Sequence, residues 1–165
     1  MPQRITFQGD KSIVANEARN VREAYFKKGG SLREAFDNIF RDKSGTTQYV
    51  SSDHVETLEV RPDGFTIFLP HSTSAVRDNF TIAHELGHYF LHTNASGTET
   101  ITHTREGSNL CEWQANWFAA ELLMPEDEFR EAAKKFKNNP AKIAAHFSVS
   151  EAAARVRMTV LGLDE

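Results

Sequence analysis

The chain of 165 residues has one cysteine, Cys111, and no long apolar run. A single cysteine excludes a disulfide within the chain and is typical of a reducing compartment. No stretch approaches the roughly 18 consecutive apolar residues of a membrane-spanning helix. The first residues also lack the apolar segment of a secretory signal. We therefore expect a cytoplasmic protein with no membrane partner.

An excess of basic residues is also missing. The formal net charge is −4, and residues 46–125 hold three Lys/Arg against ten Asp/Glu. This balance does not favour direct nucleic-acid binding, and it would suit a bound cation as well as an ordinary solvated acidic surface. With 39% hydrophobic and 25% charged residues, the composition predicts a globular protein rather than a disordered one.

The most informative stretch is DNFTIAHELGHYFLHT, residues 78–93. Apolar residues recur in it at helical spacing, so it predicts a helix with one buried stripe. His84 and His88 then lie one turn apart on one face, about 6 Å along the helix axis. With Glu85 between them they form the H-E-x-x-H pattern, in which two histidines bind a metal and the glutamate acts as general base. The pattern predicts a zinc site.

A catalytic zinc normally has a third protein ligand and a water. The metzincin pattern would require Gly and His where this chain has Leu91 and Asn94. His92 lies about 12 Å along the axis from His84, too far to share its ion, so we interpret His92 as a residue behind the ligands or at the surface.

A glutamate from a later helix is the remaining solution. Glu112 lies 24 residues after His88, on a predicted buried helix where a lone carboxylate needs a strong reason such as a metal. Asn116, one turn later, would accept the free ring N–H of a ligand histidine. Asn109 and Glu112 also fit a helix-capping pattern, which leaves other ligand candidates open. These are Glu121 first, then Glu99 and Glu106.

The periodicity predicts an α+β fold of the zincin type, with a small antiparallel sheet packed on a helical bundle that carries the H-E-x-x-H helix. We expect a single domain over 1–165, with N-terminal helices in 1–45, a zincin core in 46–125 and C-terminal helices in 126–165. Strands are expected within 47–70, joined by the turn Pro62-Asp63-Gly64, with 64–69 as the edge strand that would receive a substrate backbone. The polar stretch 93–109 is expected to be a loop flanking the cleft. The predicted helices cover 13–25, 31–40, 110–124, 126–136, 141–147 and 151–161.

Two features of the later helices admit a functional and a structural interpretation. Trp113, Trp117 and Phe118 are expected in the core rather than in a substrate pocket. Residues 141–157 have the rhythm of a helix-turn-helix, but the segment is neutral overall. We interpret it as a structural helical hairpin that could dock a partner.

The sequence resembles the ImmA/IrrE metallo-endopeptidases. The resemblance rests on FTIAHELGH at 80–88, on EWQANWFAAELLMP at 112–125, and on the tail at 144–163. It implies that His84, His88 and Glu112 bind one Zn²⁺ per chain, or another divalent metal, and that Glu85 is the general base. It also implies a cytoplasmic protease whose substrate is a helix-turn-helix (Xre-type) repressor encoded nearby.

The residue that stabilises the transition state is not evident from the pattern. His103 is the first candidate, followed by Tyr89 and His71, although an exposed side chain is the favoured interpretation of each. Two other functions remain open. One is a metal-containing binding protein, such as an anti-repressor or a toxin–antitoxin partner, that acts without cleavage; the other is a DNA-associated regulator. The presence of Glu85 favours the endopeptidase, because a purely structural metal site needs no base.

Overall fold

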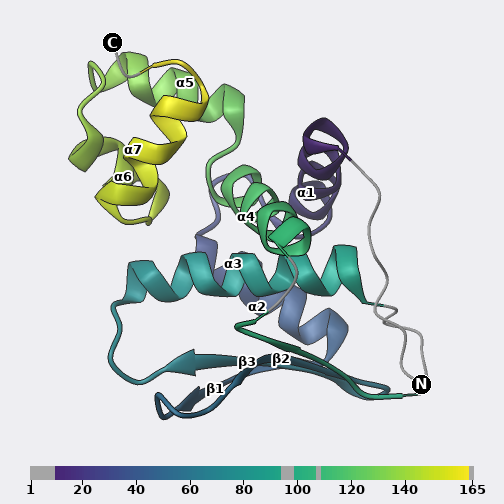
Figure 1. Cartoon of the computed structure of the whole chain (residues 1–165). Helices are drawn as coiled ribbons and strands as arrows, with labels where there is room; N and C mark the ends of the chain where they lie inside the picture. The colour runs from purple at the N-terminus through teal and green to yellow at the C-terminus, as the bar shows by residue number, and fades with distance from the viewer. Residues whose placement is uncertain (1–9, 94–98, 107–108, 164–165) are drawn as a thin grey trace.

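The computed structural model describes residues 10–93, 99–106 and 109–163. Figure 1 shows a twisted sheet with helix α3 lying across it and further helices on the far side of α3. The elements are α1 (Lys11–Tyr25), α2 (Leu32–Lys43), β1 (Gly45–Val50), β2 (Glu56–Arg61), β3 (Gly64–Pro70), α3 (Ala75–His92), β4 (Ile101–Thr104), α4 (Asn109–Leu123), α5 (Glu126–Lys135), α6 (Pro140–Phe147) and α7 (Glu151–Val160).

Each expected helix is present, and several begin at a side chain that caps the helix N-terminus. The hydroxyl of Ser31 accepts a hydrogen bond from the Glu34 amide at 3.1 Å, and Asp10 and Ser150 cap α1 and α7 in the same way. Such caps satisfy amide groups that have no partner within the helix. Local sequence therefore determines where these helices start.

The four strands form a sheet in the order β1-β3-β2-β4. The predicted hairpin at Pro62-Asp63-Gly64 is confirmed, since β2 and β3 pair antiparallel through Arg61 and Gly64. The α+β class is also confirmed, but the sheet is mixed rather than wholly antiparallel, because β1 runs parallel to β3. That pairing makes β3 an inner strand, so the expectation that 64–69 forms the edge is wrong. β1 and β4 are the edges.

Part of the expected loop is the edge strand β4. Ile101 and His103 are buried while Thr102 and Thr104 are half-buried, which is the alternation of a strand. Four residues are too few for this period to stand out in a polar stretch, so the strand could not be predicted from the sequence. Residues 94–98 and 107–108 of the expected loop lie outside the described residues.

The helices pack in a definite order on the sheet. α3 contacts β2 and β3 on one side and α4 on the other, and α1 covers α4. The C-terminal helices α5–α7 gather near the N-terminal end of α3, as Figure 1 shows, and the side chain of Asn79 donates to the Ser148 carbonyl there at 2.9 Å. One connected cluster of buried side chains runs from Val14 in α1 through the sheet to Met158 in α7.

The three aromatic residues of α4 that were expected in the core differ in their burial. Phe118 is fully buried, as predicted, but Trp113 is 57% exposed and Trp117 is only partly buried. The expectation is wrong for Trp113. Helices α3 and α1 cover two faces of α4, and Trp113 lies on a face that neither of them covers. Over the described residues, no helix is long and apolar enough to cross a membrane.

Candidate metal centre

Helix α3 presents the H-E-x-x-H residues to α4. It begins at Ala75, where the Ser74 hydroxyl accepts a hydrogen bond from the Arg77 amide, and it continues to His92. Gly87 lies where the two helices meet: a Cβ atom there would come within 3.1 Å of the Cα of Ala115 and 3.2 Å of the Cβ of Phe118. The missing side chain allows α4 to approach closely, and this approach brings Glu112 to the histidines.

Three side chains form a compact group. Nε2 of His84 lies 3.0 Å from Oε2 of Glu112, and Nε2 of His88 lies 2.9 Å from Oε1 of the same carboxylate. Within the described part of the chain, this trio is the group whose ligand atoms all lie within 4.8 Å of one another. His88 is buried, whereas the side chains of His84 and Glu112 are 15% and 32% exposed. The group is therefore reached by solvent from the Glu112 side.

The donor set fits a zinc ion. Ligand atoms about 2.0–2.1 Å from a tetrahedral zinc lie about 3.4 Å from one another, and the His–Glu separations are slightly shorter. Small movements of the side chains would admit the ion. Two imidazoles and one carboxylate, open on one side, are also a ligand set typical of catalytic zinc sites.

The other ring nitrogens of both histidines have partners. Nδ1 of His84 lies 2.7 Å from Oδ1 of Asn116, as the sequence predicted. Nδ1 of His88 lies 2.9 Å from Nδ1 of His92, whose Nε2 in turn lies 2.8 Å from Oε1 of Gln114. Because the amide oxygen can only accept, His92 donates from Nε2 and accepts from His88 at Nδ1. These contacts fix the orientation of both rings and leave each Nε2 directed at Glu112, where it would have a lone pair free for a metal once any proton on it is released.

The charges in the group favour a deprotonated carboxylate beside the imidazoles. Burial is the largest single influence on the pKa of His84 and lowers it, but the hydrogen bond to Glu112, the charges of Glu85 and Glu112 and the contact with Asn116 together outweigh burial and raise this pKa. Burial likewise opposes, but does not overcome, the hydrogen bonds from His84 and His88 that lower the pKa of Glu112. Burial lowers the pKa of His92 and so favours its neutral imidazole. A neutral imidazole can accept a hydrogen bond from the Nδ1–H of His88.

Glu85 lies in the sheet-facing wall of the site. The residue is 4% exposed, and burial raises the pKa of its carboxyl although His84 and His88 oppose the shift. The Thr57 hydroxyl on β2 lies within hydrogen-bonding distance of both the Glu85 carboxylate and the His103 carbonyl, the latter at 3.3 Å, and its single proton can be donated to either one. Oε2 of Glu85 is buried and has no hydrogen-bond partner among the described residues. A buried carboxylate oxygen without a partner in the protein is expected where a water or a substrate group forms the missing hydrogen bond.

The candidates for transition-state stabiliser lie in three different places. His103 on β4 is 6% exposed, and its ring stacks on that of His88 at 4.7 Å, so the interpretation as an exposed side chain is wrong for it. Tyr89 is also buried, but it points into the core and packs on Phe65 at 4.4 Å. His71 is exposed and stacks on Tyr49 at 6.1 Å. The structure thus brings His103 alone of the three against a ligand candidate.

The alternative third ligands are engaged or remote. Glu121 is 4% exposed and binds Arg157 at 2.6 Å and Arg19 at 3.1 Å. Glu99 and Glu106 are exposed. The rival capping interpretation of Glu112 is not favoured either, because its two carboxylate oxygens face the histidines.

Two residues of the site have no place in the sequence-based expectations. Gln114 orients His92, and Thr57 reaches Glu85 from a strand some 28 positions earlier in the chain (85 − 57). The one available signal for Gln114 was a polar residue on a helix expected to be buried, two positions after Glu112. Nothing in the sequence connects Thr57 with the helix, because that contact depends on how the sheet packs.

A hollow of about 550 Å³ lies between the ends of β2 and β3 and the first half of α3. Its lining includes Thr57, which contacts Glu85, and Thr81, one turn before His84 and Glu85. We call this hollow, lined also by Phe68, His71 and Arg105, the strand-side cleft. It leads from the surface toward the buried carboxylate.

Comparisons with known proteins identify the family of this chain. A peptidase family model described as the IrrE N-terminal-like domain matches residues 34–159, well over half of the chain. A segment of 84 residues is 32% identical to the metallopeptidase ImmA of Bacillus subtilis (strain 168), and it covers 50% of this chain and 50% of that protein. The chain therefore spans about half the length of the curated relative it matches. The resemblance inferred from the two motifs is confirmed, and the chain belongs to the ImmA/IrrE family through its IrrE N-terminal-like domain.

Proposed function

We propose that this protein is a zinc-dependent endopeptidase that binds the metal through His84, His88 and Glu112. The observation that carries the proposal is the convergence of both Nε2 atoms on one carboxylate, 2.9 and 3.0 Å away, beside the buried and unpartnered Oε2 of Glu85. In a purely structural metal site, the buried carboxyl group of Glu85 would cost desolvation free energy and would have no role.

The proposed reaction is hydrolysis of a peptide bond by water. When bound, zinc supplies a Lewis acid and lowers the pKa of a coordinated water toward about 7. With such a water in place, Glu85 would accept a proton from it at Oε2 as the water attacks the peptide carbonyl, and would donate that proton to the departing amine. The raised pKa of Glu85 suits both halves of this transfer, because it brings the carboxyl closer to working pH. Thr57 holds the carboxylate in position.

His103 is the proposed stabiliser of the transition state. Its ring lies flat against that of His88 and is buried, so it is held at the edge of the metal group. A hydrogen bond to the carbonyl oxygen as that atom gains charge would be worth more here than in water. Because β4 is an edge strand, it can also accept an extended substrate as an added strand.

The proposed substrate is a protein, and the resemblance to the family points to a helix-turn-helix (Xre-type) repressor encoded nearby. A DNA-binding role for α6 and α7 is less well supported. On α7, Arg157 is buried against Glu121, and Arg155 pairs with Glu151 at 2.8 Å. Neither arginine is therefore left free to contact a phosphate backbone.

The proposal is tested by metal analysis combined with cleavage. Wild type, Glu85→Gln and Glu112→Ala are purified without added metal, with Glu106→Ala as the matched control at an exposed glutamate outside the group. We expect about one zinc per chain in all but Glu112→Ala. Cleavage of the purified neighbouring repressor should fall by about 10²–10⁴-fold in Glu85→Gln.

Three results would contradict parts of the proposal. Full zinc content in Glu112→Ala would show that the third ligand lies elsewhere. Repressor inactivation that survives in Glu85→Gln would identify a binding protein that acts without cleavage. Salt-sensitive DNA binding by the isolated protein would identify a DNA-associated regulator.

A further inference from the structure

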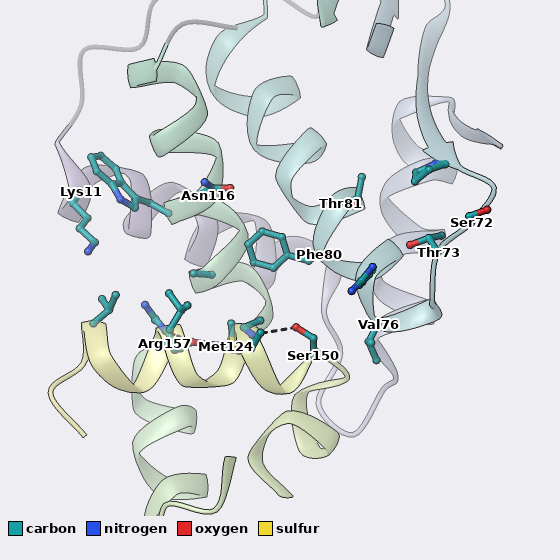
Figure 2. A pocket seen from close by; sticks show the side chains of 18 residues that line it. Lys11, Ser72, Thr73, Val76, Phe80, Thr81, Asn116, Met124, Ser150 and Arg157 are labelled. Atoms are coloured by element: carbon teal, nitrogen blue, oxygen red, sulfur yellow. Dashed lines mark hydrogen bonds between the residues drawn. The ribbon is translucent and has the colours of Figure 1, made fainter. Parts of the chain in front are cut away.

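A second and larger hollow borders the strand-side cleft. It has a volume of about 720 Å³, and its walls come from α3, α4 and α7. Figure 2 shows Phe80 of α3 facing the space above α7, with Met124 near α7 and with Asn116 and Thr81 farther from α7. We call this hollow the basic trough. Its volume is in the range of pockets that enclose most of a bound ligand, about 300–1,000 Å³.

The basic trough borders the proposed active site through Asn116. Asn116 lines it, and the same side chain lies 2.7 Å from Nδ1 of His84. Thr81, one helical turn before His84 and Glu85, lines both this trough and the strand-side cleft, and Pro70 and Ser72 are also shared. The two hollows therefore adjoin at Thr81, and an extended chain lying along this part of α3 could contact both of them.

The charges of the trough have one sign. Among the described residues that line it, the charged ones are Lys11, Arg77 and Arg157, and none is acidic. Arg157 is already balanced by Glu121 at 2.6 Å, and Lys11 lies over the Trp117 ring at 5.8 Å, whereas Arg77 is exposed at the start of α3. This concentration of cations contrasts with residues 46–125, which hold seven more acidic than basic residues. The trough is thus complementary to anionic groups.

The remaining lining is largely apolar and reaches the surface. Phe80, Trp117 and Met124 line the interior, while Val156 and Val160 on α7 are 64% and 50% exposed. Large apolar side chains gathered around a hollow at the surface are typical of a site that binds another molecule. The occupant should therefore be apolar along its length as well as anionic.

We propose that the basic trough is a specificity pocket of the proposed peptidase, and that it binds a segment of the substrate polypeptide in which large apolar residues stand next to Asp or Glu. The inference rests on the proposed function, because it takes the segment to lie on one side of the bond at the metal group. The apolar side chains contact Phe80 and Met124, and the carboxylates face Arg77 at the rim. Thr81 and Asn116 mark the junction with the reacting bond.

The test is a selection that does not require cleavage. Random peptides on a display library are captured on the zinc-loaded chain of 165 residues, as wild type and as Glu85→Gln. Two substitutions at exposed positions alter the trough: Arg77→Glu reverses a charge, and Val156→Glu places an anion in the apolar wall. Lys142→Glu and Val55→Glu are the matched controls, because both residues are exposed and lie outside the trough lining.

We expect Glu85→Gln to enrich peptides that combine large apolar residues with Asp or Glu. Capture of those peptides should fall about fivefold in Arg77→Glu, as for reversal of an exposed ion pair. It should fall about tenfold in Val156→Glu, since an apolar contact is lost and a repulsive charge is gained. Both controls should capture the peptides as wild type does.

The outcomes separate this inference from the proposed function. Enrichment of basic or charge-free peptides, no enrichment at all, or equal effects in the trough and control variants would each overturn the specificity pocket. If wild type cuts peptides while the trough variants leave the cut-site preference unchanged, the peptidase stands and the pocket falls. If the enriched peptides bind as expected but remain uncut by wild type, the pocket stands as a binding site and the peptidase falls.

Discussion

The Nδ1 atoms of His88 and His92 lie 2.9 Å apart on the buried side of α3, and Gln114 of α4 holds the far nitrogen of His92 at 2.8 Å. His92 is thus the group that fixes the tautomer of His88, although it is too far along the helix to bind the same ion as His84. Asn116 does the same for His84 at 2.7 Å. Each proposed ligand histidine therefore has its own acceptor, and both acceptor networks include a residue of α4.

Loss of either acceptor should weaken metal binding. We expect His92→Leu and Asn116→Ala each to lower zinc affinity by about 10- to 100-fold, because the imidazole loses its fixed tautomer and orientation. Titration against a chelator of known affinity measures the change. His146→Leu, at an exposed histidine, is the control. Unchanged affinity in a folded His92→Leu protein would show that the His88–His92 contact does not orient the ligand.

Stabilisation by zinc should increase with pH. In the metal-free protein burial lowers the pKa of His84, but the hydrogen bond to Glu112 and the neighbouring carboxylate charges together raise this pKa above that of an ordinary histidine. A proton on His84 therefore competes with zinc at a higher pH than it would on an ordinary histidine. The stability of the metal-free protein changes in the opposite direction to zinc binding and decreases as pH rises. The contribution of His84 to the free energy of unfolding is complete below the pKa of His84 in the unfolded chain, and it is lost as pH rises through the higher pKa of the folded protein.

Both effects enlarge the zinc-induced rise in Tm as pH increases from about 5 to 8. Thermal unfolding with and without zinc, at a series of pH values, measures this difference. The carboxylate of Glu112 does not reverse the trend, because its pKa is lowered and its contribution is lost only in stronger acid. A zinc-induced shift in Tm that is the same at every pH would contradict the arrangement of His84 and Glu112.

Gly87→Ala should destabilise the protein although alanine is the better helix former. The new Cβ would meet backbone and side-chain atoms of α4 at 3.1–3.2 Å. Overpacking of this kind costs about 1–3 kcal/mol, against a gain of about 1 kcal/mol in helix propensity. Urea unfolding of the metal-free protein measures the net change, and Gly87→Ser should cost more. A stabilised Gly87→Ala protein would show that α3 and α4 separate without penalty.

The buried ion pair between Glu121 and Arg157 should matter for stability and not for metal content. Both side chains are almost fully buried, and Arg157 also donates to the Met124 carbonyl at 3.0 Å. Arg157→Met should cost about 3–5 kcal/mol, because Glu121 keeps its burial and loses its closest partner. Arg155→Met on the same helix breaks an exposed pair with Glu151 and should cost only about 0.3–0.5 kcal/mol.

Chemical unfolding of both variants, with zinc analysis of each, tests this expectation. If Arg157→Met lost zinc while remaining folded, the prediction would be wrong, because the ion pair in the C-terminal helices would then affect metal binding. Equal costs at the two arginines would show that burial of Glu121 carries little penalty.

The metal helix and its two histidines could be predicted from the sequence because their relation is local. Residues four apart share a face of any α-helix, so the spacing of His84 and His88 already places them together. The same reasoning identified Asn116, one turn after Glu112. Helix starts such as that at Ser31 were equally predictable, since a cap satisfies amides only a few residues away.

Features that depend on contacts between distant segments could not be read in this way. The parallel pairing of β1 with β3, and hence the inner position of β3, depends on which strands meet in the sheet, and strand periodicity carries no information about partners. β4 was missed because four residues are too short a pattern. Trp113 was placed in the core because its helix is apolar on most sides, while its exposure is decided by where α1 and α3 pack.

By itself, the sequence determined the helix, the two histidines with the glutamate between them, and the family. The tertiary structure alone decided how Glu112 reaches both histidines, because that distance depends on the close approach of α4 at Gly87. It also decided that His92 hydrogen-bonds to Gln114 and that the sheet residues Thr57 and His103 lie beside the metal group. The wall that α7 forms in the basic trough depends on tertiary packing as well. The physical reason is the same in each case: backbone geometry fixes local spacing, whereas contacts between elements are fixed only when their buried faces pack together.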